Sequence, residues 1–118
     1  TGRVPEVFPY YRLADTFVTA SQGEGLPVTL LEAMAADVPI LAPDIPGVDE
    51  VVRPGATGEL YSTGDLAALA TAIERFTGRD LTTYVEAIRE SVESRFDVET
   101  IAQSYRDLYA AVCSSEIV

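Results

Sequence analysis

The sequence predicts an α/β domain in which a parallel sheet of about three strands is flanked by helices. Short β-favouring apolar runs alternate with longer segments whose apolar residues recur at helical spacing. This alternation implies parallel strands joined by right-handed helical crossovers. Three strands are few for a sheet covered on both faces, so at least one edge should lack its natural neighbour. The 118-residue chain is therefore expected to be half of a larger domain.

The expected elements follow from apolar periodicity and from proline, glycine and aspartate boundary signals. Strands are expected over 16–20, 39–42 and 58–61, the first of them buried. Helices are expected over 10–14, from Pro27 to the break at Asp37, over 48–52, between Asp65 and Gly78, over 81–94 and over 98–112.

Composition excludes several function classes. The net charge of −11 argues against a nucleic-acid partner, which requires a basic surface. The chain has no lysine for a Schiff base and no histidine for general-base or metal chemistry. Its single cysteine, Cys113, leaves no disulfide within the chain, which agrees with a cytoplasmic location. No apolar run is long enough to span a membrane.

The stretch 21–36, SQGEGLPVTLLEAMAA, is the expected functional site. It follows the first predicted strand as a polar turn holding Glu24, and continues as a helix that carries Glu32. Open α/β sheets bind their ligands outside the carboxyl ends of the strands, where this turn should lie.

Backbone amides at the start of this helix form a predicted anion site. The N–H groups of Gly25, Leu26 and Val28 should cluster there beside the positive end of the helix dipole, whereas Pro27 has no N–H. Gly23 and Gly25 let the backbone approach a ligand closely. Judged on spacing alone, however, Glu32 is better explained as an exposed helix glutamate, and Glu24 is explained as a turn carboxylate near a helix start.

Outside this stretch, the tyrosines are interpreted as core or interface residues. The glycines at positions 47 and 58 are interpreted as turn residues, and Arg12, Arg53 and Arg75 as surface charges.

The segment E-G-L-P-V-T-L-L-E, preceded by A-S-Q-G, resembles the E-x7-E signature of retaining GT-B glycosyltransferases of group 1 (family 4). The resemblance continues through L-A-D-T-F-V-T-A-S, L-E-A-M-A-A-D-V-P-I-L-A, P-G-V-D-E-V-V, G-A-T-G-E-L-Y and S-Y-R-D-L-Y. It covers nearly the whole chain in order, so it is far more specific than the isolated signature. It implies a partial Rossmann-like domain, the donor-binding C-terminal domain of such an enzyme.

The resemblance implies a role for each residue of the site. Glu24 is expected as the catalytic-region carboxylate against the donor sugar. Glu32 is expected to bind the ribose hydroxyls, because a carboxylate can accept two hydrogen bonds. The segment from Gly23 through Gly25, Leu26, Pro27 and Val28 is expected to contact the sugar and diphosphate. The substrate would be a UDP- or GDP-sugar, the configuration would be retained, and no metal or cofactor would be needed.

The resemblance also implies what this chain lacks. Its three strands correspond to strands 4, 5 and 6 of the order 3-2-1-4-5-6. Residues 1–96 would be the second half of the nucleotide-sugar-binding domain and residues 97–118 a C-terminal helix. The missing N-terminal half would supply the acceptor site and diphosphate-binding cations, so the chain alone should be inactive. Asp37 stands where the family usually has glycine, and Pro46-Gly47 replaces a Gly-Gly pair.

Two other interpretations remain open at this stage. One is a non-catalytic module that binds a nucleotide or phosphate through the same turn. The other is a structural domain that forms homo-oligomers through an exposed strand edge.

Overall fold

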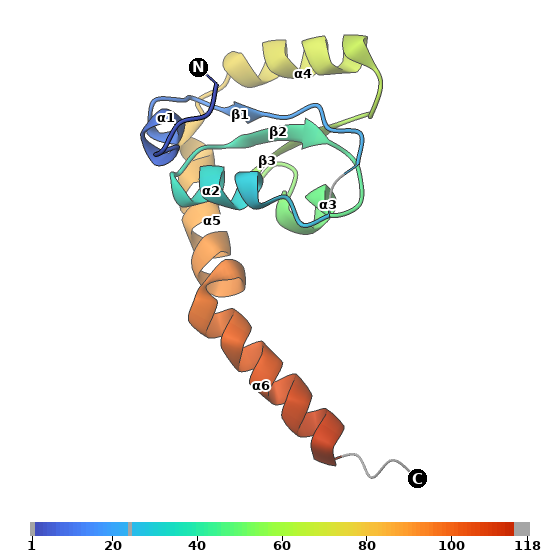
Figure 1. Ribbon diagram of the computed structural model, residues 1–118. Coiled ribbons are helices and arrows are strands. Elements are labelled where there is room, and N and C mark those ends of the chain that lie inside the picture. The colour runs from blue at the N-terminus through green and yellow to red at the C-terminus, as the bar shows by residue number, and fades with distance from the viewer. Residues whose placement is uncertain (1, 24, 115–118) are drawn as a thin grey trace.

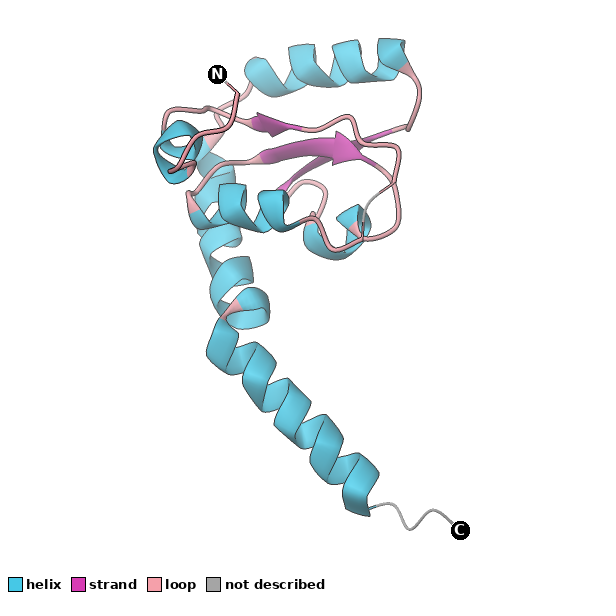
Figure 2. Ribbon diagram, in the orientation of Figure 1, coloured by secondary structure: helices cyan, strands magenta, loops and turns pink. Residues whose placement is uncertain are grey.

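The computed structural model describes residues 2–23 and 25–114, and its architecture is α/β (Figure 1). Its elements are α1 (Phe8–Arg12), β1 (Phe17–Val18), α2 (Val28–Ala35), β2 (Ile40–Pro43), α3 (Val48–Val51), β3 (Gly58–Tyr61), α4 (Leu66–Thr77), α5 (Thr82–Ser91), the π-helical turn η1 (Val92–Phe96) and α6 (Val98–Ser114). Helices and strands alternate up to α4, and only helices follow (Figure 2).

The described strands form one parallel sheet in the order β1-β2-β3. Phe17 pairs with Ile40, and Ile40 pairs in turn with Gly58, so the strands run side by side in sequence order. All four residues of β2 are buried, because a strand lies on each side of β2 and helices cover both faces of the sheet. The predicted fold class is confirmed.

Helices pack on the two faces of the sheet. Helix α4 lies on one side, and α2 and α3 lie on the other (Figure 1). Phe76 of α4 packs against Tyr84 of α5, with ring centroids 5.3 Å apart, and this contact closes the core at the end of α4. Asp65 caps α4 as predicted, since its carboxylate accepts a hydrogen bond of 2.9 Å from the Ala68 N–H.

Several boundaries differ from those predicted. The first strand contains two residues instead of five and is not buried: Val18 is 41% exposed, because β2 is its only described strand neighbour. Helix α1 begins at Phe8, two residues earlier than expected, with Pro9 in its first turn. Helix α5 passes at Val92 into the wider turn η1 instead of continuing to Ser94.

Helix α6 extends away from the sheet (Figure 1). It has no buried residue in its described length. The predicted apolar stripe is therefore exposed, with Tyr105, Leu108 and Tyr109 each more than half exposed. The boundary predicted after residue 96 remains a prediction.

Candidate functional site

The turn between β1 and α2 lies at the carboxyl ends of the strands, as expected for the ligand site of an open parallel sheet (Figure 1). Glu24 lies outside the described residues. On either side of it, Gly23 and Gly25 are exposed, and an added side-chain carbon at either position would meet no atom within 4 Å. Leu26 is 58% exposed and Val28 is 60% exposed. The described part of this turn is thus mostly open to solvent, but Pro27 is buried.

The N-cap residue of α2 is a proline. Pro27 precedes the helix with an extended backbone (ψ 96°), so the helix begins one residue later than predicted. Pro27 makes no side-chain cap hydrogen bond, and the first turn of α2 contains no acidic residue. The positive end of this helix is therefore not neutralised from within its own first turn, which suits the predicted anion site.

Glu32 is held by a tyrosine from α1. It is half-buried on α2, and its Oε2 accepts a hydrogen bond of 3.0 Å from the hydroxyl of Tyr11. Tyr11 is only 7% exposed, and its ring packs against Phe17 at 5.7 Å between centroids. Burial, together with the neighbouring Glu32, raises the pKa of Tyr11 to about 12. The phenol therefore stays protonated and able to donate at neutral pH.

A second tyrosine holds the segment that leads into the turn. The hydroxyl of Tyr61 in β3 donates a hydrogen bond of 2.8 Å to the Thr19 carbonyl, directly after β1. The hydroxyls of Thr19 and Ser21 lie 3.2 Å apart and share a further hydrogen bond. Burial raises the pKa of Tyr61, so its hydroxyl also remains a donor. A cavity of about 180 Å³ lies beside this contact, and Ser21 and Gln22 form part of its wall.

The sequence did not reveal either tyrosine contact. Both tyrosines were predicted to be core or interface residues, and both are indeed buried. Each also uses its hydroxyl to hold the candidate site, across 21 residues for Tyr11 and 42 residues for Tyr61. No local pattern links positions so far apart, so only the folded chain reveals the partners.

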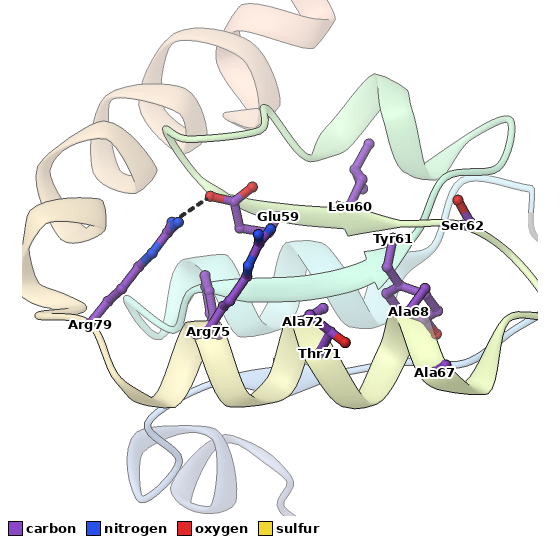
Figure 3. Close-up of a pocket in the computed structure, with 11 residues that line it drawn as sticks. Glu59, Leu60, Tyr61, Ser62, Ala67, Ala68, Thr71, Ala72, Arg75 and Arg79 are labelled. Atoms are coloured by element: carbon purple, nitrogen blue, oxygen red, sulfur yellow. Dashed lines mark hydrogen bonds and ion pairs between the residues drawn. The ribbon is translucent and has the colours of Figure 1, made fainter.

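A larger cavity lies elsewhere. It measures about 440 Å³ and runs between β3 and α4, where the short side chains of Ala68 and Ala72 leave space (Figure 3). At one end, Arg79 forms an ion pair of 2.8 Å with Glu59. Neither Glu32 nor any residue of the turn lines this cavity. Of the predicted stretch 21–36, Ser21 and Gln22 line the smaller cavity beside Tyr61 instead.

The remaining predictions concern charges and metals. Arg12, Arg53 and Arg75 are exposed, as predicted. Over residues 2–23 and 25–114, no group of three or more acidic or cysteine side chains is placed to hold a metal ion. In the same part of the chain, no helix combines the length and the apolarity needed to cross a membrane.

Gly58 is not a turn residue, contrary to its interpretation from sequence. It lies in β3, where an added side-chain carbon would stand 2.1 Å from the Ile40 carbonyl oxygen. Gly47, by contrast, does occupy a turn position before α3, at a φ of 88°.

The parallel sheet, its two helical layers and the turn at the strand ends define a partial Rossmann-like α/β domain. Among solved structures, Anabaena Alr3699/HepE in complex with UDP superposes with a TM-score of 0.74 at 26% identity, over 86% of this chain and 29% of that protein. Residues 1–79 match the family described as glycosyl transferases group 1. The chain belongs to this family.

Two curated relatives are similar to most of this chain. A phosphatidyl-myo-inositol mannosyltransferase of Mycobacterium leprae is 36% identical over 88% of this chain and 28% of its own length. An exopolysaccharide phosphotransferase of Streptomyces coelicolor is also 36% identical, over 87% of this chain and 11% of its own length. The chain thus spans less than a third of either relative.

Proposed function

We propose that this chain is the second half of the nucleotide-sugar-binding domain of a retaining GT-B glycosyltransferase of family 4. The complete enzyme transfers a glycosyl group from a nucleotide-sugar to an acceptor, and the nucleoside diphosphate is the leaving group. The donor is a UDP- or GDP-sugar, and the reaction uses no metal or other cofactor. An N-terminal half supplies the acceptor site, and the enzyme works in the cytoplasm.

In this proposal the site residues contact different parts of the nucleotide-sugar donor. Glu24 is the carboxylate beside the donor sugar and the catalytic residue of this chain. Glu32 accepts hydrogen bonds from the ribose. Gly23, Gly25 and the segment 26–28 contact the sugar and the diphosphate, and the helix dipole stabilises the charge that develops on the leaving group.

The observation that supports this proposal most directly is the start of α2. A helix of eight residues begins at the carboxyl ends of the strands without a side-chain cap and carries a half-buried carboxylate in its second turn. A phosphate at the helix start and a ribose beside that carboxylate would satisfy both features. Family membership and the structural similarity to a protein crystallised with UDP support the same ligand.

Calorimetry on the intact protein tests nucleotide binding. UDP and GDP are titrated into wild type, Glu32→Ala and the control Glu74→Ala, which removes an exposed glutamate from α4. The proposal expects binding of at least one nucleotide, a loss of about tenfold in affinity for Glu32→Ala and no change for Glu74→Ala. Equal affinities for wild type and Glu32→Ala would refute the ribose-binding role.

A transfer assay separates the enzyme from a binding module. The intact protein should transfer sugar from a nucleotide-sugar with retained anomeric configuration, and Glu24→Gln should lower kcat. The isolated 118-residue chain should show no transfer. Nucleotide binding without transfer by the intact protein would favour the non-catalytic module instead.

A further inference from the structure

The hydrogen bond between Tyr11 and Glu32 connects the candidate ribose carboxylate to a helix outside the E-x7-E segment. We propose that Tyr11 is a positioning residue: it fixes the carboxylate of Glu32 and thereby sets the preference of this site for ribonucleotides over 2′-deoxyribonucleotides. The inference rests on the proposed function, because it requires Glu32 to receive the ribose.

The geometry leaves Glu32 free to bind while it is held. Tyr11 donates one hydrogen bond to Oε2 at 3.0 Å. A carboxylate has about four lone-pair positions, so Oε1 and the second position on Oε2 remain for ribose hydroxyls. The Tyr11 hydroxyl and the ribose hydroxyls do not compete, because all of them are donors and the carboxylate has a separate lone-pair position for each.

Tyr11 is itself held in place, so it is suited to position another side chain. It is 7% exposed, and its ring packs against Phe17. The hydroxyl is therefore presented by a packed ring and not by a mobile surface side chain. A glutamate on a helix loses rotamer freedom when it binds a ligand, and a partner that restricts it beforehand reduces this entropic cost.

The protonation state of Tyr11 also suits a positioning role. Burial and the contact with Glu32 keep Tyr11 protonated through the neutral range, with a pKa of about 12. A neutral phenol donates to the carboxylate without neutralising its charge, whereas an arginine in the same place would pair with it. Glu32 thus stays a strong acceptor for hydroxyl groups.

The structure provides a matched control. Tyr84 likewise donates a hydrogen bond of 3.0 Å to a glutamate, Glu59, and is 4% exposed. Glu59 of this second pair lines the cavity between β3 and α4, which no residue of the turn lines (Figure 3). Tyr84→Phe therefore removes the same kind of contact, together with a hydrogen bond of 3.1 Å from Arg79 Nη1, without touching the candidate ribose site.

The experiment uses calorimetry to measure the affinity of the intact protein for UDP and for 2′-deoxyuridine diphosphate. The same measurement is made with GDP and 2′-deoxyguanosine diphosphate. Wild type should prefer the ribonucleotide by about tenfold. Tyr11→Phe keeps the ring and should weaken binding of the ribonucleotide by about three- to tenfold, with little change for the deoxy form. Tyr84→Phe should leave the ratio of the two affinities unchanged. In a Glu32→Gln background, Tyr11→Phe should have no further effect on this ratio.

Three other results are possible, and each contradicts the inference in a different way. If Tyr11→Phe weakens both nucleotides equally, Tyr11 contributes only packing. If it changes neither affinity while Glu32→Gln abolishes the preference, Tyr11 has no positioning role and the proposed function stands. If Glu32→Gln itself leaves the preference intact, the ribose-binding role fails and the inference fails with it.

Discussion

Asp37 and Arg89 form a two-point ion pair that joins the end of α2 to α5. The guanidinium donates from Nε to Oδ1 at 2.9 Å and from Nη2 to Oδ2 at 2.6 Å. Asp37 also has a φ of 65°, the left-handed conformation that glycine adopts most easily. A glycine, which the resemblance implies for this position, would adopt the conformation without strain. In this chain an aspartate adopts it and gains a partner 52 residues away.

The ion pair should make stability depend on pH in the acidic range. Hydrogen bonds from Arg89 lower the pKa of Asp37 below its ordinary value of 3.8. A carboxyl group with a lowered pKa stabilises the fold above its ordinary pKa, and this contribution is lost as the pH falls through the lowered value. Urea unfolding should therefore show wild type more stable than Asp37→Asn at pH 7, with the difference vanishing in strong acid. The effect should be small and should shrink in high salt, because both side chains are more than a third exposed.

The left-handed backbone conformation of Asp37 predicts that two other substitutions at this position differ from each other in stability. Asp37→Gly and Asp37→Ala both remove the ion pair, but only alanine retains the cost of a left-handed backbone. Asp37→Gly should thus be the more stable of the two by about 1 kcal/mol in chemical unfolding. Equal stabilities would show that the backbone at this position relaxes when the ion pair is removed.

Gly58 should tolerate no side chain. An alanine there would place its Cβ 2.1 Å from the Ile40 carbonyl oxygen, within the pairing of β2 and β3. Gly58→Ala should cost at least about 3 kcal/mol or prevent folding, measured by unfolding or by the soluble yield. Gly78→Ala is the control, because Gly78 has a φ of −86° and an added Cβ would make only ordinary contacts. It should be neutral or slightly stabilising.

The hydroxyl of Tyr61 should stabilise the entry to the candidate site. Tyr61→Phe removes the hydrogen bond to the Thr19 carbonyl and should cost about 1 kcal/mol of unfolding free energy. Amide hydrogen exchange should accelerate at Thr19, whose N–H donates to the Leu41 carbonyl at 3.1 Å. Tyr105→Phe, on an exposed ring of α6, should change neither quantity. Unchanged exchange at Thr19 would mean that the pairing with β2 alone holds this segment.

Removal of residues 97–118 should leave the core intact. The described part of α6 contributes no buried residue, so its loss exposes little that the sheet needs. The thermal midpoint of residues 1–96 should be close to that of the full chain, by calorimetry or circular dichroism. A fall of many degrees would contradict the predicted boundary and would show that the helix supports the α/β core.

Local patterns in the sequence were sufficient for most of the fold. Apolar runs located all three described strands, and apolar periodicity over 81–94 located α5. Boundaries were less well predicted. The strand at 16–20 has a β-favouring composition, but strand length depends on neighbours, and β1 has only β2 beside it. The helix over 81–94 shows no breaker in its sequence, yet its backbone widens at Val92.

For the candidate site, the sequence by itself determined the class of residue and its place along the chain. A polar turn after a strand, a helix start and a glutamate in that helix are short-range features, and the family is recognisable from them. Only the tertiary structure decided how these features are held. Tyr11 reaches Glu32, Tyr61 reaches Thr19 and Arg89 reaches Asp37 because packing brings distant segments together. Such contacts depend on the relative placement of whole helices and strands, which no local pattern records.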